Sequence, residues 1–538
     1  MPQFDPLKYA FASHRNVVYA TKGMACSTSP IASQVGLEIL KSGGNAMDAA
    51  IAMATTLPLV EPTGNGLGSD CFALIWTDGH LYGLDGSGVA PMALSADKVR
   101  EAGYSAVPMN GWLPTMVPGA PSAWAELRRR FGTKSMAELM APAISYARDG
   151  FCIPVNVYKQ WKAEVVRFTA AAKEDPAVFG PWLEYFTKNG QPYAPGERFY
   201  NPDYAATLES LAESDCESYY RGEIMKKIVD FSNRTGGFFA ESDFTNYKAQ
   251  WVEPISVDYR GYQVCEIPPN GQGIAALMAL NILKEFAFPE KDCAETYHRQ
   301  LEAMKMAFAD AFHYVTDPRF MKLDYHQLLE PDYGARRAAE MGETARIYSH
   351  AVPPKSGTVY LCCADGEGNM VSFIQSNYMG FGSGVVVRGT GISLQNRGHD
   401  FSLSPEDINA LAPGKRSYHT IIPGFLMRSG TPVGPFGVMG GYMQPQGHLQ
   451  VVMNYVDFHL DPQQALDAPR WQWMRDNSVT VETRFDMELA RQLQRRGHNI
   501  QTELSTPSFG RGQMIVRLDN GTLVGGTESR TDSNIACF

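Results

Sequence analysis

A threonine directly after a glycine is the residue of this sequence best placed for chemistry. Gly357 and Thr358 lie in PPKSGTVYLCCADGEGNMVSF, whose pattern predicts that a strand begins at the threonine. A threonine hydroxyl is a weak nucleophile unless a base lies next to it. An N-terminal threonine carries that base in its own α-amino group, whose unperturbed pKa of about 7.7–8 suits work near neutral pH. Only a backbone cut creates such an amine inside a chain, so the segment is either a plain loop or a cleavage site.

Gly357 favours cleavage, because a residue without Cβ can adopt the strained geometry of an N-to-O acyl shift. Gly440 and Gly441, which follow an apolar run in FGVMGGYMQPQGH, could supply the other half of such a site. Paired glycines let backbone N–H groups approach a ligand closely, as an oxyanion hole requires. A tight turn is the other interpretation of this pair.

Other catalytic patterns are missing from the sequence. The eleven histidines are scattered without HExxH or comparable ligand spacing, which predicts neither a metal site nor a cofactor. No GxSxG nucleophile motif is present. The run GNGLGSD at 64–70 has neither the Lys-Ser/Thr of a phosphate loop nor the spacing of a dinucleotide loop, so we expect a structural turn.

Composition narrows the class of protein. The 538 residues are 44% hydrophobic and 19% charged, as in globular proteins, and the net charge of −10 argues against nucleic-acid binding. The N-terminal stretch MPQFDPLKYAFASHRNV has no apolar signal region, and no stretch approaches the ~20 apolar residues of a membrane span. We therefore expect a cytoplasmic protein that binds neither nucleic acid nor membrane.

The nine cysteines include no CxxC pair. Cys362 and Cys363 are adjacent on a predicted strand, and neighbouring strand residues point to opposite faces, so they are poorly placed to bridge each other. We expect buried free thiols, typical of a reducing compartment.

The elements that would position these residues follow from periodicity and capping. In SPIASQVGLEILKSGGNAMDAAIAMATTL, Ser29 can cap a first helix that Gly43-Gly44 ends, and Asn45 caps a second, almost wholly apolar helix. CFALIWTDGHLYGLDG predicts a hairpin that turns at Asp78-Gly79.

Residues from about 118 to 350 are mostly helical in pattern, with a strand pair in ISVDYRGYQVCEI. After residue 358 strand patterns dominate, with one helix predicted in FDMELARQLQRRG. The sum is a mixed α/β chain with a helical first part and a β-rich second part.

Together these stretches resemble the γ-glutamyltranspeptidase family of N-terminal nucleophile hydrolases. The matching motifs follow the family's order over nearly the whole chain: SGGNAMDAAIA, PTGNGLGSDCFALIW, VPGAPSAW, YARDGF, YRGYQVCEIPP and GTGISLQNRGHDFS. The resemblance implies a stacked four-layer αββα sandwich that cuts itself before Thr358. Residues 1–357 would form a large, mainly helical α chain with core strands, and residues 358–538 a strand-rich β chain that carries the nucleophile. The two chains would stay together as an αβ heterodimer, and a dimer of such heterodimers is a further assembly to consider.

The resemblance also implies roles for matching residues. Thr358 stands at the nucleophile position, after Gly357, and Ser376 at the place of a hydroxyl that assists processing and holds the free amine. Gly440 and Gly441 match the oxyanion-hole pair. Asp400, in HDFS, matches an acid that binds the substrate's α-amino group in true transpeptidases.

Three departures lie where the family grips a γ-glutamyl group. Ser87 replaces the arginine that binds the substrate α-carboxylate, Tyr378 replaces an asparagine, and His419-Thr420 replaces a pair of serines. We expect His419, Thr420 and Tyr378 to line the altered substrate site. Arg397 is the cation expected to bind a substrate carboxylate, because a guanidinium can do so bidentately; a structural ion pair with Asp400 is the alternative.

The stretches PPNGQG, QSNYMGFGSG and SLQNRG most resemble the cytoplasmic amidase and acylase branch of the family. The activity implied is hydrolysis of a small carboxylate-bearing amide through an acyl-threonine intermediate, with conversion of oxamate to oxalate and ammonia, a step of purine catabolism, as the first candidate. The alternatives are a γ-glutamyl hydrolase or transferase acting on glutathione-like substrates, a cephalosporin-acylase-like amidase, and an uncut, inactive scaffold.

Overall fold

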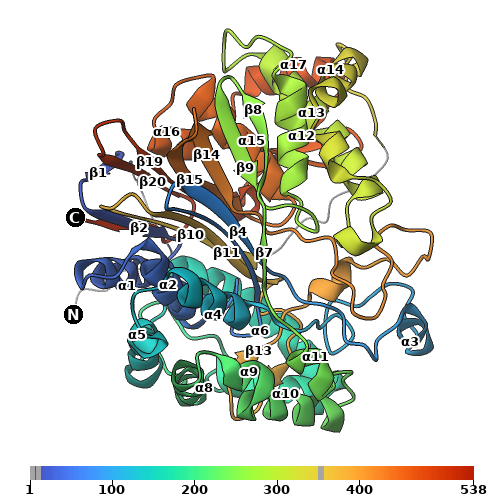
Figure 1. Cartoon of the computed structure of the whole chain (residues 1–538). Coiled ribbons are helices and arrows are strands. Elements are labelled where there is room, and N and C mark those ends of the chain that lie inside the picture. Colours follow the sequence, from blue (N-terminus) through green and yellow to red (C-terminus); the bar gives the residue numbers. More distant parts are fainter. Residues whose placement is uncertain (1–6, 8–13, 349–356) are drawn as a thin grey trace.

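Two stacked β-sheets form the centre of the molecule (Figure 1). The computed structural model describes residues 7, 14–348 and 357–538. Most of the N-terminal stretch and all of PPKS, residues 353–356, therefore lie outside the described residues.

The first sheet has seven strands, and each neighbouring pair in it is antiparallel. In spatial order its strands are β21 (Asn534–Cys537), β2 (Gly23–Ser27), β10 (Gly357–Asp365), β11 (Met370–Tyr378), β3 (Asp70–Thr77), β4 (His80–Gly86) and β7 (Gln250–Val252). β10 therefore lies between β2, which precedes the expected cut, and β11, which follows it. The cut would fall after Gly357, the first residue of β10, which pairs with Tyr378. The other pairs of both ladders involve β10 residues beyond the cut, so the two resulting chains share one hydrogen-bonded sheet.

The second sheet is also seven-stranded and antiparallel throughout. In spatial order it contains β1 (Val18–Ala20), β20 (Leu523–Thr527), β19 (Arg511–Arg517), β15 (Thr431–Met439), β14 (Gly424–Arg428), β9 (Tyr262–Glu266) and β8 (Ile255–Tyr259). It too combines strands from before and after residue 358, so neither part of the chain could complete a sheet alone.

Strand β10 is buried on both faces, which explains its apolar composition. Tyr360 and Cys362 belong to the core between the two sheets. Leu361 and Cys363 belong to the core between the first sheet and its helices. The alternation of side chains along a strand accounts for this division, because successive residues point to opposite faces.

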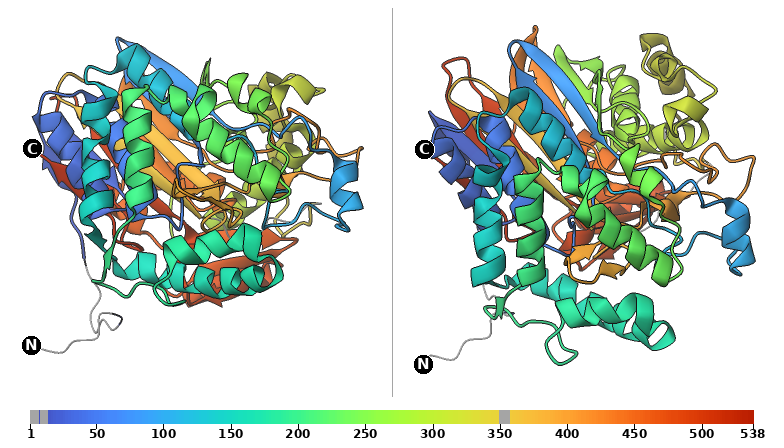
Figure 2. Two further views of the ribbon diagram at one scale, coloured as in Figure 1. Left: turned by 90° about the horizontal axis from the view of Figure 1, so that it is seen from below. Right: turned by 60° about the horizontal axis from the view of Figure 1, so that its bottom comes forward.

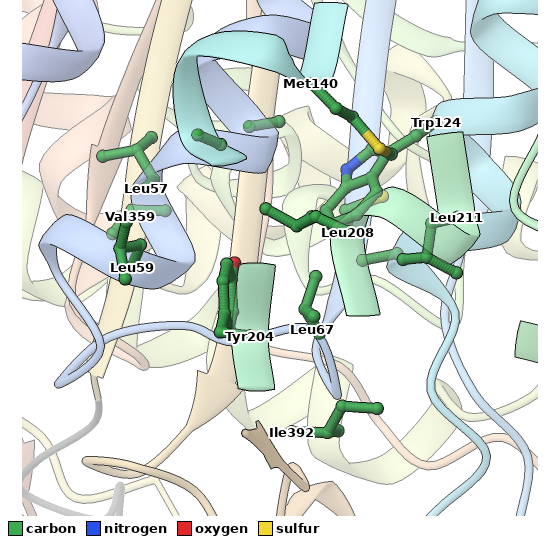
Figure 3. Close-up of a cluster of buried hydrophobic side chains, with 14 of the residues drawn as sticks. Leu57, Leu59, Leu67, Trp124, Met140, Tyr204, Leu208, Leu211, Val359 and Ile392 are labelled. Carbon is green, nitrogen blue, oxygen red and sulfur yellow. The ribbon is translucent and has the colours of Figure 1, made fainter. Parts of the chain in front are cut away.

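Helices cover the outer face of the first sheet. α1 (Pro30–Lys41), α2 (Ala46–Val60) and α4 (Ala120–Phe131) pack on its strands, while α5 (Met136–Asp149) packs on α2 and α8 (Pro202–Glu213) on α5. Figure 3 shows part of this core, where Leu57 and Leu59 of α2 lie beside Val359 of β10. α2 is buried along its whole length, as its apolar sequence predicts, and the Asn45 side chain accepts the Asp48 N–H at 2.9 Å.

Further helices extend this side of the sandwich (Figure 2). They are α6 (Val155–Glu174), α7 (Pro176–Phe186), α9 (Glu217–Arg221), α10 (Glu223–Arg234) and α11 (Glu241–Thr245), with α3 (Ala96–Glu101) at one edge of the molecule. Two short strand pairs lie outside the two large sheets. One joins β5 (Phe151–Cys152) to β6 (Arg198–Phe199), and the other joins β12 (Val386–Val387) to β13 (Ile392–Ser393).

A second helical layer packs on the outer face of the second sheet. It contains α12 (Gly273–Leu283), α13 (Ala294–Tyr314), α14 (Pro331–Glu340), α15 (Met443–Val456), α16 (Pro462–Asp467) and α17 (Met487–Arg495). A small sheet of β16 (Trp471–Arg475), β17 (Ser478–Glu482) and β18 (Asn499–Glu503) lies with them. The order helix, sheet, sheet, helix is the αββα sandwich expected from the sequence.

Most local predictions are confirmed. The Asp78-Gly79 turn joins β3 to β4, and both of its residues have positive φ, 51° and 75°. Ser29 does occupy the N-cap of α1, but its side chain makes no capping hydrogen bond.

The expectation of one helix after residue 358 is wrong. α15 and α16 also form there, and α15 was missed because MQPQGHLQVVMNYV is buried on nearly every side and shows no amphipathic period. All nine cysteines are free, and six are buried, but Cys152 is exposed.

Gly437 of β15 tests how closely the two sheets pack. A Cβ at this position would lie 2.4 Å from the Tyr360 ring of β10, closer than packed atoms can approach. We expect Gly437→Ala to lower the free energy of unfolding by about 1–3 kcal/mol, because the buried ring must shift. Urea denaturation measures the change.

Gly180→Ala in α7 is the matched control, since its new methyl group would have 3.9 Å of clearance. It should be neutral or slightly stabilising, because alanine favours a helix over glycine. Equal stabilities for the two variants would contradict this account of the sheet packing.

Candidate active site

The Ser376 hydroxyl connects Thr358 to the preceding peptide. Ser376 Oγ lies 3.1 Å from Thr358 Oγ1 and 2.7 Å from the Gly357 carbonyl oxygen, and it accepts the Tyr378 N–H at 2.8 Å. A carbonyl can only accept, so the one serine proton points to Gly357, and the Thr358 hydroxyl must then donate to Ser376. The nucleophile, a proton acceptor for it and a donor to the carbonyl under attack are therefore aligned in the uncut chain.

Tight backbone packing fixes this junction. The ladder between β10 and β11 shifts register between Gly357 and Val359, so Thr358 lies at a bulge. A Cβ on Gly357 would lie 2.6 Å from the Thr63 carbonyl oxygen, and one on Gly64 would lie 3.0 Å from the Thr358 carbonyl oxygen. The glycine-rich run at 64–70 is thus a turn, as expected, and it forms one wall of the Gly357–Thr358 junction.

Asp70 extends the row of polar groups to a third strand. It pairs with Ser376 in the ladder between β3 and β11, so the side chains of Thr358, Ser376 and Asp70 follow one another across β10, β11 and β3. Burial raises the pKa of Asp70 to about 7, although Arg397 opposes the shift. Asp70 was not predicted as a site residue. The feature that could have indicated it is a carboxylate at the start of an otherwise apolar strand.

His419 completes this row from the second part of the chain. Its Nε2 lies 3.1 Å from Asp70 Oδ2, while its Nδ1 accepts the Ile421 N–H at 3.4 Å. The proton is therefore on Nε2 and is donated to Asp70. Burial lowers the pKa of His419 well below its usual value, and Arg397 and Arg416 lower it further, so the imidazole is neutral.

Arg397 is a buried cation with unused donors. Its side chain is 1% exposed, its guanidinium lies over the Tyr378 ring at 4.0 Å, and Nη1 donates to Thr420 Oγ1 at 2.6 Å. Nη1 also lies 3.5 Å from Asp400 Oδ2. Nε and Nη2 have no hydrogen-bond partner among the described residues. The ion pair with Asp400 exists, but it leaves the donors on Nε and Nη2 without a partner among these residues.

Asp400 is already engaged by protein groups. Its Oδ1 accepts the Tyr378 hydroxyl at 2.5 Å and the Tyr442 hydroxyl at 3.4 Å. Burial raises the pKa of Asp400, and the positive charge of Arg397 opposes that rise. Within the described chain, its Oδ2 has no hydrogen-bond partner and only the contact with Arg397, so an α-amino group that bound here would have to share that oxygen with the guanidinium.

Gly440 and Gly441 form the turn between β15 and α15. Their φ angles are 138° and 63°, a region that favours glycine. Gln272 Nε2 donates to the carbonyl oxygens of Gly441 at 2.8 Å and Thr420 at 2.5 Å, which ties this turn to the 416–420 segment.

Within the described part of the chain, the N–H groups of Gly440 and Gly441 donate to no protein acceptor. They precede a helix, where free N–H groups and the helix dipole both favour negative charge. The Tyr360 ring fills the space beside Gly437, which places the start of β10 near this end of β15. The arrangement can stabilise an oxyanion.

Ser87 is paired with a second arginine that the sequence analysis overlooked. Arg416 Nε donates to Ser87 Oγ at 3.1 Å and to its carbonyl oxygen at 3.4 Å, and lies 3.8 Å from Asp85 Oδ2. The guanidinium of Arg416 is therefore bonded to Ser87, the residue at which the resemblance led us to expect an arginine.

Comparisons with known proteins follow the same pattern. A family model described as gamma-glutamyltranspeptidase matches residues 32–538. The chain belongs to the γ-glutamyltranspeptidase family. The Bacillus subtilis glutathione hydrolase-like YwrD proenzyme is 36% identical over 529 residues, with 96% of this chain and 98% of the relative covered. The Klebsiella pneumoniae oxamate amidohydrolase proenzyme is 33% identical over 532 residues, covering 96% and 99%.

A crystal structure of a cephalosporin acylase from Bacillus halodurans is 54% identical, with a TM-score of 0.96 and coverage of 100% of this chain and 99% of that one. As a member of the γ-glutamyltranspeptidase family, the chain is an amidohydrolase made as a proenzyme that cuts itself into two associated chains. Within its described residues, no helix is both long and apolar enough to cross a bilayer.

The structure brings the predicted site residues into two connected groups. Thr358, Ser376 and the Gly357 carbonyl form one, and Arg397, Asp400, Tyr378 and Thr420 form the other. Tyr378 joins them, since its N–H bonds Ser376 while its hydroxyl bonds Asp400. The roles of these residues in catalysis are proposals, developed below.

Thr358→Ala should remain one uncut chain of 59.3 kDa, because the same hydroxyl must attack the Gly357 carbonyl. The wild type should give fragments of about 39 and 20 kDa, in proportion to the lengths of residues 1–357 and 358–538. Thr358→Ser should be cut slowly. Denaturing gels and mass spectrometry follow the fragments.

Ser376→Ala should slow the cut by about 10²–10³, the usual cost of losing one donor to a developing oxyanion. Ser372→Ala is the control, because Ser372 lies on the same strand as Ser376 but its hydroxyl bonds Tyr360 and not the Gly357–Thr358 junction. A Thr358→Ala chain that still yields a fragment starting at residue 358 would show that another protease makes the cut.

Proposed function

We propose that the mature enzyme hydrolyses a small amide whose acyl group carries a carboxylate but no α-amino group, with oxamate as the first candidate. The observation that carries the proposal is the buried Arg397 guanidinium, whose Nε and Nη2 have no partner among the residues that the structure describes. It lies over the ring of Tyr378, and the Tyr378 N–H is bonded to Ser376 beside Thr358. Unpaired buried donors are costly, so a ligand acceptor that pairs with them gains binding energy.

The proposed reaction uses Thr358 twice. After the cut, the free α-amine of Thr358 takes the proton of its own hydroxyl, and Oγ1 attacks the substrate amide carbon. The N–H groups of Gly440 and Gly441 stabilise the oxyanion. Ammonia or an amine leaves with the transferred proton, and water then releases the carboxylic acid from the threonine ester.

The engaged state of Asp400 supports an acyl group without an α-amino group. Two tyrosine hydroxyls and Arg397 already surround this carboxyl group. Both tyrosines bond Oδ1, so a γ-glutamyl ammonium would have to share Oδ2 with the like-charged Arg397, whereas an acid without the amine leaves that ion pair undisturbed. This argument separates the proposed substrate class from glutathione-like compounds.

A cephalosporin-acylase-like amidase is the second candidate. The 54% identity to a protein described as a cephalosporin acylase supports an amidase with a larger leaving amine, whereas the oxamate amidohydrolase relative is 33% identical. Both candidates share a carboxylate and lack the α-amine, so Arg397 has the same proposed role in each. A cytoplasmic location also remains a proposal.

A matched pair of chromogenic substrates tests the class. Glutaryl-p-nitroanilide and γ-glutamyl-p-nitroanilide differ only in the α-amino group. We expect kcat/KM to be at least about tenfold higher for the glutaryl compound, since displacing a buried hydrogen bond costs of order 1–3 kcal/mol. Assays with oxamate, succinamate and glutaramate then rank the chain length. A preference for the γ-glutamyl anilide would overturn the assignment.

Arg397→Ala adds an internal check with oxamate and its neutral relative oxamide. Loss of a carboxylate partner should lower kcat/KM for oxamate far more than for oxamide. An equal loss for both would mean that Arg397 acts only through the structural pair with Asp400.

Asp70 should make substrate binding sensitive to pH. Its pKa of about 7 means that the carboxyl group is largely neutral below pH 7 and anionic above it. An anion here repels an anionic substrate, so KM for oxamate should rise roughly fivefold as pH increases from 6 to 8, equivalent to about 1 kcal/mol of repulsion. Asp70→Asn should remove that rise, and oxamide should show none in either protein. A pH-independent KM for oxamate in the wild type would contradict the assignment.

A further inference from the structure

A second group of buried polar side chains lies far from Thr358 in sequence, under the last described segment of the large chain. His298 and Glu302 are four residues apart on α13, and His498 comes from the turn before β18. One donor atom from each lies within 4.8 Å of the other two. All three side chains are buried, which is unusual for charged and titratable residues without a partner or a metal.

The two imidazoles already face each other. His298 Nδ1 lies 2.9 Å from His498 Nε2, and His298 Nε2 lies 2.9 Å from the Gly342 carbonyl oxygen. A carbonyl can only accept, so His298 carries its proton on Nε2 and offers a lone pair at Nδ1. This is the usual state of a metal-binding histidine, whose other nitrogen donates to a carbonyl or carboxylate and fixes the ring.

Glu302 and His498 have unused capacity. Glu302 Oε2 accepts the Arg346 N–H at 3.2 Å, whereas Oε1 has no hydrogen-bond partner and only an ion pair with Lys305. His498 Nδ1 also has no partner among the described residues. If the His498 proton moved to Nδ1, both Nε2 of His498 and Nδ1 of His298 would present lone pairs to a cation.

We propose that His298, Glu302 and His498 form a binding site for a divalent transition-metal ion, with zinc as the best match. Two neutral imidazoles and one carboxylate are a donor set that zinc accepts, with a fourth position left for water. Two nitrogens on one zinc ion lie roughly 3.3 Å apart, so the imidazoles must separate by only a few tenths of an ångström.

Lys305 is the competitor for this site. Its Nζ contacts Glu302 and also donates to the Arg346 carbonyl oxygen at 2.7 Å and to Asn477 Oδ1 at 3.1 Å. These two acceptors can hold the ammonium when the metal takes Oε1. Lys305 therefore lowers the affinity for metal without blocking the site.

The site would connect the two chains of the processed enzyme. His298 and Glu302 precede residue 358, and His498 follows it. A metal ion bound by all three would bridge the chains in the outer helical layer, beside the 342–346 segment that leads toward the cut. Ligand spacing in the sequence did not predict this site, because the two histidines are 200 residues apart.

Titration of the metal-free processed protein with zinc, and with cobalt as a spectroscopic probe, tests the proposal. We expect one tightly bound ion per heterodimer, a cobalt spectrum of tetrahedral type without a sulfur charge-transfer band, and a higher denaturation midpoint with zinc. His498→Gln should weaken binding by about 100-fold or more and remove the stabilisation, since it deletes a direct ligand. His326→Gln, at an exposed histidine paired with Asp324, is the control and should change nothing.

Lys305→Met gives a test of opposite sign. Removing the competing ammonium should tighten zinc binding and enlarge the stabilisation by zinc, even where the metal-free variant is less stable. Absence of stoichiometric binding in the wild type, binding that survives His498→Gln, or a sulfur charge-transfer band would each overturn the proposal.

Discussion

The hydrogen bonds of one serine hydroxyl determine how the rest of the site can work. Ser376 Oγ joins Thr358 Oγ1 to the Gly357 carbonyl oxygen, so its position decides both which bond can be attacked and where the resulting charge falls. A hydroxyl has one proton, and the Tyr378 N–H occupies one of its lone pairs. The directions of the remaining two bonds are therefore fixed, and no flexible side chain has to find its place before the cut.

The sandwich supplies the rigidity that this alignment needs. Thr358 is the second residue of a central strand that is hydrogen-bonded on both sides and buried on both faces, and glycines at 64, 357 and 437 allow backbone and ring atoms to approach it closely. Each sheet contains strands from both sides of residue 358, so a cut there detaches only Gly357 from its strand. The same architecture can thus hold the scissile peptide and later keep the two chains together around the new amine.

Sequence patterns predicted a mixed α/β chain and the hairpin that turns at Asp78-Gly79, because turn chemistry and side-chain alternation act locally, whereas the αββα sandwich followed from the resemblance to the family. They did not reveal Asp70 or Arg416. Asp70 reaches the site through strand pairing with Ser376, and Arg416 through contact with Ser87, 329 residues away in the chain. α15 was missed for another reason: a helix buried on nearly all sides lacks the period by which helices are recognised. Contacts made by tertiary packing leave no local signature.

Two buried arginines, Arg397 and Arg416, bring positive charge to this part of the molecule, and they differ in how the fold pairs them. Arg416 contacts Ser87 but is held by Asp85, whereas Arg397 is only partly neutralised by Asp400, whose other oxygen is bound by tyrosines. A buried guanidinium whose Nε and Nη2 lack partners in the described part of the chain is expensive to maintain unless a ligand uses it, whereas the Nε of Arg416 is already bonded to Ser87. This difference in pairing is why the proposed function assigns the substrate carboxylate to Arg397 and not to Arg416.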